Sequence, residues 1–401
     1  MIFNVALFFY LLAILPKLLF DLLKGKKHPS LLQRLGASLP NPQGKPVIWI
    51  HGVSVGEIKA AQPLFRALKQ KHPSAFFLIT TTTATGQSEA RRSLSEADAF
   101  CYLPLDFTFV VRRWVQKLRP QLFLLIESDF WPNLLAAIQR AGGKTILVSG
   151  KMSERSFKRF LLFSPLARCL FDRFDLLLVQ NQTHHGRFFP FANPSRLHIT
   201  GNLKLDFQPQ IPDTSYWKGK ISLPVITIAS THAPEEEQIL DALKNLDLFL
   251  FLAPRHPERF EAVAELLTQK KIPFIRFSQP HLQGERVVLV DAMGRLPLCY
   301  SLSRLAIVGG SFIPQIGGHN ILEPCLYGAP VLFGPHMHAQ EELTARVLEA
   351  KAGRQVPLNQ LSSSIRDLLH DSAMQHAAKK IIETCKGATE KVLPHINDLF
   401  R

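Results

Sequence analysis

A glycine-rich motif in the first half of the chain carries a carboxylate that could act as a general base. The motif lies between an apolar run typical of a strand and a segment with helical periodicity, and it reads His51-Gly52-Val53-Ser54-Val55-Gly56-Glu57. Gly52, Ser54 and Gly56 would let the backbone approach a ligand closely. Glu57 could then take a proton from an acceptor hydroxyl. A carboxylate in the first turn of a helix is also stabilised by the helix dipole, so a purely structural role for Glu57 stays open.

The same residues match the G-x-S-x-G pattern of serine hydrolases, in which Ser54 would be the nucleophile. That site needs an oxyanion-binding N–H group from the loop after an earlier strand. Only an apolar segment and a basic segment precede the strand predicted at residues 47–50. The hydrolase is therefore the weaker interpretation, and labelling of Ser54 by a fluorophosphonate probe would support it.

Charged residues also follow two later apolar runs of this half. Glu127-Ser128-Asp129 ends the run LFLLIE and precedes Trp131-Pro132, while Lys151 directly follows the run TILVS. Asp129 could cap the helix predicted after it. Alternatively, Glu127 and Asp129 form a polar floor that holds Glu57 or orients the acceptor. Lys151 is the basic residue best placed to bind an anionic ligand.

In the second half, polar residues follow four predicted strands. They are Ser230-Thr231-His232, Pro254-Arg255-His256-Pro257-Glu258, Met293-Gly294, and Gly309-Gly310 leading to Gly317-Gly318-His319-Asn320-Ile321-Leu322-Glu323-Pro324. The carboxyl ends of parallel strands meet at one edge of a sheet, so these loops predict a nucleotide site.

The last loop is the most informative of the four. Gly317 and Gly318 would let backbone N–H groups at a helix start face a phosphate. Asn320 could cap that helix, and Glu323 could reach sugar hydroxyls. The chain has no G-x-G-x-x-G after the first strand of either half and no P-loop motif, which disfavours a dinucleotide site. No Asp-rich or His/Cys set predicts a structural metal.

Buried strands that alternate with amphipathic segments must position these loops. The predicted strands lie at residues 47–50, 76–81, 122–127, 145–149, 176–180, 225–230, 248–253, 273–277, 287–291, 305–310 and 330–334. Uninterrupted apolar strands alternating with helices indicate parallel sheets covered on both faces. We therefore expect a domain over 24–204, a linker over 205–224 and a second domain over 225–401.

The excess positive charge lies in one half of the chain. Residues 1–200 hold 26 Lys and Arg against 11 Asp and Glu, whereas the rest holds 21 of each. This asymmetry predicts an anionic partner such as a membrane surface, phosphorylated lipid or nucleic acid. Basic residues interleaved with aromatic ones, which base stacking needs, are not evident, so nucleic acid is the weaker alternative. The five scattered Cys residues argue against a disulfide framework.

The N-terminal segment predicts membrane association. Residues 1–16 carry no charge, and apolar residues continue to Leu23, with Lys17 and Asp21 as interruptions. Positive charge follows this run, which differs from a secretory signal and would leave the rest of the protein on the cytoplasmic side. We expect residues 1–23 to form an anchor helix that spans the membrane or lies in its interface; a buried helix is the alternative.

In this light the sequence resembles the Kdo (3-deoxy-D-manno-octulosonic acid) transferases of lipopolysaccharide assembly, over nearly the whole chain. The segments that carry the resemblance are HGVSVGE (51–57), ESDFWPN (127–133), GNLKLD (201–206), STH (230–232), PRHPER (254–259), AMG (292–294), VGGS (308–311), GGHNILEP (317–324) and FGPH (333–336). The resemblance implies the GT-B architecture, two Rossmann-like domains that face a cleft. It also implies an inverting transfer of Kdo from CMP-Kdo to a lipid A precursor, lipid IVA, without a metal or other cofactor, at the cytoplasmic face of the inner membrane.

By the same resemblance, Glu57 matches the family's general base. The positions around the donor nucleotide match Gly201, Lys204, Ser230, His232, Arg255, His256, Met293, Gly294, Gly317, Gly318, Asn320 and Glu323. The acceptor side would comprise Ser54, Gly56, Glu127, Asp129 and Lys151. A transferase of the same fold that uses another nucleotide sugar, such as a UDP-sugar, on a lipid acceptor is the alternative.

The chain departs from the family pattern at three places. The family often has Glu where this chain has Asp129, Arg where it has Lys151, and Asn where it has Ala339. These departures concern the second carboxylate of the acidic loop at Asp129, the proposed anion contact at Lys151, and position 339. Glu57 and the segment from Gly317 to Glu323 keep the pattern.

Overall fold

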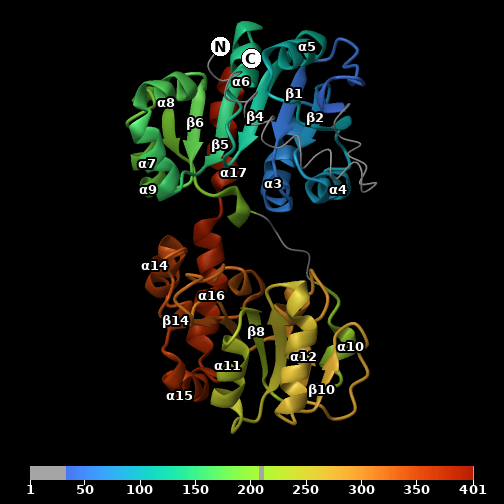
Figure 1. The fold of residues 1–401 in the computed structure, drawn as a ribbon, viewed down its shortest axis with the longest axis vertical. Coiled ribbons are helices and arrows are strands. Elements are labelled where there is room, and N and C mark those ends of the chain that lie inside the picture. The colour runs from blue at the N-terminus through green and yellow to red at the C-terminus, as the bar shows by residue number, and fades with distance from the viewer. Residues whose placement is uncertain (1–32, 207–211, 401) are drawn as a thin grey trace, which may run out of the picture. The chain divides into compact units, whose positions relative to one another are not determined.

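The computed structural model describes residues 33–206 and 212–400, which form two α/β units (Figure 1). The first unit takes Met1–Phe207 together with Cys385–Arg401, and the second takes Gln208–Thr384. Each unit is built on one parallel sheet of seven strands. The prediction of two doubly wound parallel-sheet domains is therefore confirmed.

The first sheet has the strand order β3-β2-β1-β4-β5-β6-β7. Its strands are β1 (Val47–His51), β2 (Phe76–Thr81), β3 (Ala99–Tyr102), β4 (Pro120–Ile126), β5 (Lys144–Gly150), β6 (Leu176–Val179) and β7 (Leu197–Ile199). From β1 the chain continues through β2 and β3 to one edge of the sheet. From β4 it continues through β5 and β6 to β7 at the other edge. Beyond the carboxyl ends of β1 and β4 lies the switch point where such sheets bind ligands. The loops with Glu57 and Glu127 leave the sheet there.

Helices cover both faces of this sheet because its strands are apolar on both sides. One face packs against α3 (Val55–Lys71), α4 (Ala84–Ser93) and α17 (Ala388–Leu399). The other packs against α5 (Thr108–Leu118), α6 (Pro132–Arg140), α7 (Glu154–Leu162), α8 (Ser164–Phe171) and α9 (Gln182–Phe188). In α3, buried Ile58, Ala61, Phe65 and Leu68 recur at helical spacing, which fixes the face it turns to the sheet.

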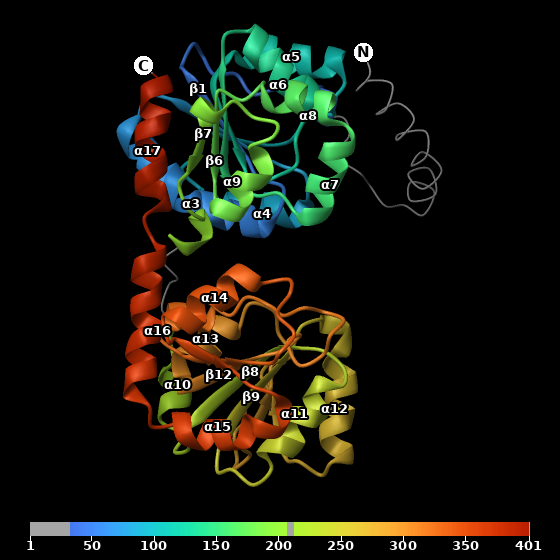
Figure 2. The same ribbon diagram turned by 90° about the vertical axis from the view of Figure 1, so that its left-hand side faces the viewer.

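The second sheet has the order β10-β11-β9-β8-β12-β13-β14, so its switch point lies between β8 and β12. Its strands are β8 (Val225–Thr231), β9 (Phe249–Pro254), β10 (Phe274–Arg276), β11 (Val287–Leu289), β12 (Leu305–Val308), β13 (Val331–Phe333) and β14 (Gly353–Gln355). Its helices are α10 (Ser215–Lys218), α11 (Glu235–Leu243), α12 (Phe260–Gln269), α13 (Leu296–Leu302), α14 (Glu341–Glu349), α15 (Leu361–Leu368) and α16 (Ser372–Cys385). Figure 2 shows β8, β9 and β12 with α11 and α12 beside them.

Three strands were not predicted from the sequence: β3, β7 and β14. Each has three or four residues and lies at an edge of its sheet. An edge strand pairs with a neighbouring strand along only one of its two edges and is more exposed than a central strand. Its residues therefore need not form an uninterrupted apolar run. The sequence AFCY or GRQ therefore carries too weak a signal to be recognised.

Both predicted boundaries of the second domain need correction. Helix α17 belongs to the first unit, where its Ala388, Val392 and Ile396 are buried against α3 and the sheet (Figure 2). Within the predicted linker over 205–224, Trp217 is buried in the core of the second unit against Phe251. Burial of large apolar side chains is favourable. It holds α17 on the core of the first unit and Trp217 in the core of the second.

The predicted anchor over residues 1–23 lies outside the described residues. Among the residues that the structure describes, no helix is both long enough and apolar enough to cross a membrane.

Candidate active site

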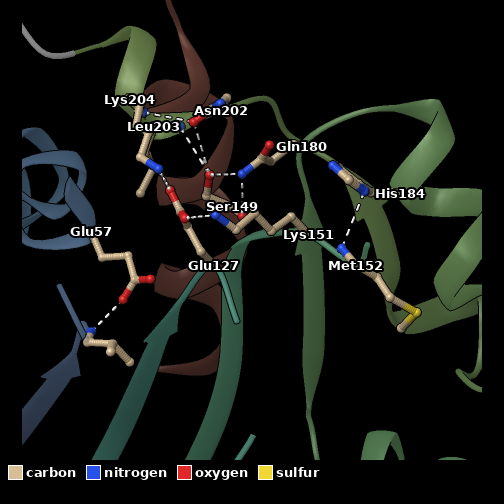
Figure 3. Close-up of polar contacts among 11 residues, drawn as sticks. Glu57, Glu127, Ser149, Lys151, Met152, Gln180, His184, Asn202, Leu203 and Lys204 are labelled. Carbon is tan, nitrogen blue, oxygen red and sulfur yellow. Dashed lines mark hydrogen bonds and ion pairs between the residues drawn. The ribbon is translucent and has the colours of Figure 1, made fainter. Parts of the chain in front are cut away.

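Glu57 lies in the first turn of α3, directly after the loop that leaves β1. Its side chain is buried, and one carboxylate oxygen accepts a hydrogen bond from the backbone N–H of Val53 (Figure 3). Gly52 packs closely against Glu57, because a Cβ there would lie 3.2 Å from the Cβ of Glu57. The loop is held from β2 by Thr83, whose hydroxyl donates to the carbonyl of Val53 at 3.0 Å.

The surroundings of Glu57 favour a carboxylate that gains and loses its proton near neutrality. Burial raises the pKa of Glu57 to about 7, and the negative charges of Glu127 and Asp129 act in the same direction. The Val53 N–H and the positive charge of Lys151 oppose that rise. A general base works best when its pKa lies near the working pH, so the geometry suits proton abstraction.

Glu127 lies at the end of β4 and is paired with two lysines. Its side chain is 1% exposed; its carboxylate lies 2.5 Å from Nζ of Lys151 and also pairs with Nζ of Lys204. Burial alone would raise the pKa of Glu127, but the two ammonium groups hold it below its ordinary value. Glu127 is therefore a charged residue, in contrast to Glu57.

A polar network fixes the segment that carries Lys204. The side chain of Gln180, after β6, donates to the carbonyl of Ser149 at 2.9 Å, and the Ser149 hydroxyl accepts from the N–H of Leu203 at 3.3 Å (Figure 3). Asn202 accepts from the N–H of Lys204 at 3.0 Å. These contacts start the short 3₁₀ helix η2 (Leu203–Leu205) beside the carboxyl end of β5.

The loop that carries Lys151 is fixed from α9. The N–H of Met152 donates to Nδ1 of His184 at 3.3 Å, and Arg187 donates to the carbonyl of Met152 at 2.8 Å. Burial lowers the pKa of His184 to about 4, so its ring is neutral and can accept this bond.

Asp129 does not cap α6, which corrects one interpretation of the acidic loop. The first N–H groups of α6, those of Asn133 and Leu134, donate instead to Asp106 at 3.0 and 2.7 Å. Asp129 is exposed and has a φ of +73°, and Glu127 has a φ of +66°. Two residues other than glycine in this strained conformation are typical of a functional loop.

Ser54 begins α3 in an extended conformation, with φ −121° and ψ 168°, rather than at the strained turn of a nucleophile elbow. The buried His51 has its Nδ1 3.0 Å from the Thr80 carbonyl and Oγ1. Burial lowers the pKa of His51 to about 3. This geometry gives no support to the hydrolase interpretation.

Two of the residues predicted on the donor side lie in the first unit. Lys204 contacts Glu127, and a Cβ added to Gly56 would lie 3.8 Å from its Cε. Gly201 has a φ of +100° and packs against Ala388 of α17. The structure thus brings Lys204 together with Gly56, Glu127 and Lys151, three of the five residues predicted on the acceptor side.

In the second unit, three histidines from different loops lie together. Nε2 of His232, after β8, lies 2.8 Å from Nε2 of His319, and their rings are stacked. The ring of His256, after β9, lies edge-on to His232 with centroids 5.4 Å apart. Burial lowers the pKa of His319 to about 4 and also lowers that of His232, so one neutral ring donates to the other.

No helix begins at Gly317–Asn320, which corrects the prediction of a phosphate-binding helix start there. The segment is irregular and leads through a turn at 321–323 into the 3₁₀ helix η4 (Pro324–Tyr327). Gly317 and Gly318 have φ of +84° and +86°, a conformation that does not continue into a helix. Close packing also requires a glycine at position 318, because a Cβ there would overlap Sδ of the buried Met337.

The remaining residues predicted on the donor side occupy the other loops. Ser230 has a φ of +57° at the end of β8, Gly294 has a φ of +76°, and Met293 is 63% exposed after β11. Arg255 is exposed after β9. Asn320 accepts from the N–H of Leu322 at 3.0 Å. Glu323 is half-buried, and its negative charge, after burial, helps raise the pKa of Tyr327 to about 12.

Sequence reasoning missed Glu235, a fully buried residue at the start of α11. Its carboxylate accepts from the N–H groups of His232, Gly310 and Phe312 at 3.0, 2.7 and 3.0 Å. Glu235 stands three residues after His232, a spacing typical of helix capping, and this was the available signal. Among the described residues, no group of three His, Cys, Asp or Glu could hold a metal ion.

Comparison with known proteins identifies the family. Residues 29–207 match the family model of 3-deoxy-D-manno-octulosonic-acid transferase (kdotransferase). The 3-deoxy-D-manno-octulosonic acid transferase of Chlamydia muridarum is 33% identical over 381 residues, 91% of this chain and 88% of the relative. That of Haemophilus influenzae is 33% identical over 394 residues, 92% and 91% of the two chains.

A solved structure supports the fold. The putative UDP-N-acetylglucosamine 2-epimerase of Listeria monocytogenes is similar with a TM-score of 0.64 at 13% identity, covering 89% of this chain and 97% of that one. At this identity the likeness shows the two-sheet, GT-B-like fold alone. The 33% identity to the two transferases, over 88% and 91% of their lengths, shows the family. The chain belongs to the 3-deoxy-D-manno-octulosonic acid transferases, a family of glycosyltransferases.

Proposed function

We propose that this protein transfers Kdo from CMP-Kdo to a lipid A precursor, lipid IVA, in lipopolysaccharide biosynthesis, with inversion at the anomeric carbon and without a metal. Membership of the family and the names of its relatives support the transfer of this sugar. Within the proposal, the first unit holds the acceptor and the loops after β8, β9, β11 and β12 of the second hold the donor.

The observation that carries the proposed mechanism is the contrast between Glu57 and Glu127. Glu57, buried and with a pKa raised to about 7, removes the proton from the acceptor hydroxyl. The resulting oxygen nucleophile attacks the anomeric carbon of Kdo. The bond from that carbon to the CMP phosphate oxygen breaks, and CMP leaves with the electron pair. Glu127 stays ionised between its lysines and cannot take the proton as readily.

Positive charge on the first unit supports recognition of a phosphorylated acceptor. Lys151 and Lys204 come from different segments and converge on Glu127. Their side chains remain 42% and 40% exposed, so each can also contact a ligand phosphate. In this proposal Lys204 acts near the reacting hydroxyl rather than at the nucleotide.

An exposed apolar corner between α7 and α8 supports association with an anionic membrane. Leu161, Leu162 and Phe163 are 46%, 78% and 66% exposed, and basic Lys158 and Arg159 precede them on α7. Apolar side chains flanked by basic ones are typical of surfaces that lie in the membrane interface. We place the enzyme at the cytoplasmic face of the inner membrane, with residues 1–23 as its anchor.

The test is transfer by the full-length protein, with CMP-Kdo and a tetra-acylated lipid A precursor as substrates and the product weighed by mass spectrometry. Glu57→Gln should lower the rate about 10²- to 10⁴-fold while the Kd for CMP stays within about twofold. The matched control is Glu96→Gln, an exposed carboxylate of the same unit. Turnover by the Glu57 variant at the control rate would remove Glu57 from the mechanism. Transfer from a UDP-sugar in place of CMP-Kdo would overturn the donor assignment.

A further inference from the structure

We infer that Glu235 is the positioning residue of the donor site, holding two of its loops, those after β8 and β12, in the conformation that binds the nucleotide. The inference rests on the proposed function, because it takes the loops around His232, Gly310 and Gly318 as the donor site. The relatives' names and the sequence motifs give Glu235 no role.

The contacts of Glu235 are directed at backbone groups of two different loops. One oxygen accepts from the N–H of His232, after β8, and from that of Gly310, after β12, at 3.0 and 2.7 Å. The other oxygen accepts from the N–H of Phe312 at 3.0 Å. Two of the three donors lie 75 and 77 residues away along the chain, so Glu235 does more than cap α11.

The later part of the β12 loop is reached through Gly310. The carbonyl of Gly310 accepts from the N–H of Gly318 at 2.7 Å, which ties the Gly317–Asn320 segment to Gly310. The hydrogen bond to the N–H of His232 holds the same residue whose ring meets His319 of that segment at 2.8 Å. A single carboxylate therefore fixes loops that come from β8 and β12, on the two sides of the switch point.

Glu235 is closely packed as well as hydrogen-bonded. Glu235 is 0% exposed, and a Cβ on Gly309 would lie 2.9 Å from its Oε2 and 2.8 Å from Cα of Thr231. A buried carboxylate is costly unless its oxygens accept hydrogen bonds. In Glu235 three backbone N–H groups provide those bonds. An amide side chain of the same shape would turn an N–H₂ group toward one of those donors and lose at least one bond.

The next residue provides a matched control. Glu236 is 1% exposed and lies on the same helix, but its carboxylate is paired with the side chain of Arg259 at 3.0 Å. Glu236→Gln removes an equally buried negative charge and the partner of Arg259, at the end of the β9 loop, without touching a backbone N–H of the loops after β8 and β12. Comparison of Glu235→Gln with Glu236→Gln therefore separates loop positioning from a general loss of buried charge.

The experiment measures CMP binding by calorimetry and the KM values for both substrates with the full-length protein. For Glu235→Gln we expect the Kd for CMP and the KM for CMP-Kdo to rise at least about tenfold, while the KM for the lipid acceptor stays within about twofold. For Glu236→Gln both donor constants should stay within about threefold. Glu235→Asp keeps the charge and should recover part of the loss; it also serves as the second variant if the amide folds poorly.

Each outcome has a distinct meaning. Equal losses of CMP affinity in the two Gln variants, or a Glu235 variant that binds CMP like the wild type, would overturn the inference. Failure of the unmodified protein to bind CMP would instead contradict the proposed donor, whatever the variants do.

Discussion

Lys151 and Glu127 form an ion pair of 2.5 Å at the carboxyl ends of the neighbouring strands β5 and β4. The N–H of Lys151 also donates to the carbonyl of Glu127 at 3.0 Å, so backbone and side chains hold the two loops together. The charge of Glu127 raises the pKa of Glu57, and that of Lys151 lowers it. This pair therefore tunes the proton affinity of the proposed base.

The pH dependence of transfer should follow the ionisation of the Glu57 carboxyl group. Because its pKa lies at about 7, kcat/KM should rise with pH and level off above that value, with about a tenfold loss for each pH unit below it. The measurement is a pH–rate profile from pH 5 to 9 at constant ionic strength. A rate that does not change over this range would contradict a base with this pKa.

The same pKa shift predicts how stability varies with pH. A folded-state pKa above the unfolded value of 4.5 means that the contribution of Glu57 is fully present below pH 4.5 and is lost as pH rises through about 7. Glu57→Gln should therefore gain about 1–3 kcal/mol relative to the wild type between pH 5 and pH 8. Urea unfolding at the two pH values measures this difference, with Glu96→Gln as the variant that should show none.

Glu127→Gln should shift the acid limb of the pH–rate profile. The substitution removes the repulsion that raises the pKa of Glu57 and leaves Lys151 without its carboxylate partner. The pKa in kcat/KM should fall by up to about one unit. The control is Glu154→Gln, whose partners are Lys158 on the same helix, α7, and Arg187 on α9. An equal shift in both variants would mean that a general change in charge, not this contact, sets the pKa.

Removal of both lysines should reverse the pH dependence of the contribution that Glu127 makes to stability. In the wild type its pKa is lowered, so its contribution to stability is present at neutral pH and is lost as pH falls. In Lys151→Met/Lys204→Met, burial alone would raise that pKa, and stability should fall as pH rises from 5 to 8. Each single variant should lose about 1–3 kcal/mol at pH 7. Lys144→Met, which breaks a surface pair with Asp175, is the control for urea unfolding at both pH values.

Asp206 should hold the C-terminal helix on the first unit. Its carboxylate accepts from the N–H groups of Gly387 and Ala388 at 2.7 and 3.2 Å, where α17 begins. Asp206→Ala should lower stability by about 1–2 kcal/mol and speed amide exchange in α17. Asp371→Ala, which removes a 2.9 Å bond to the N–H of Met374 in α16, should speed exchange in α16 instead. Unchanged exchange in α17 would mean that apolar packing alone holds that helix.

The sequence by itself determined the fold class and the loops that carry the chemistry. Short apolar runs that alternate with amphipathic segments are typical of the strands of a covered parallel sheet, and such sheets bind ligands at the carboxyl ends of their strands. Glu57, Glu127 and Lys151 each follow such a run closely, so the sequence alone predicts their place at that edge of the sheet. Short edge strands such as β14 escaped because they carry no comparable run.

Only the tertiary structure decided which of these residues meet and what charge each one carries. Lys204 joins Glu127 from a segment 77 residues further along the chain, and Glu235 reaches Phe312 across the same separation. The α17 segment returns to the first unit because apolar residues on one of its faces bury against that sheet. Proximity, burial and hence pKa depend on contacts between residues distant in sequence, and local patterns do not contain those contacts.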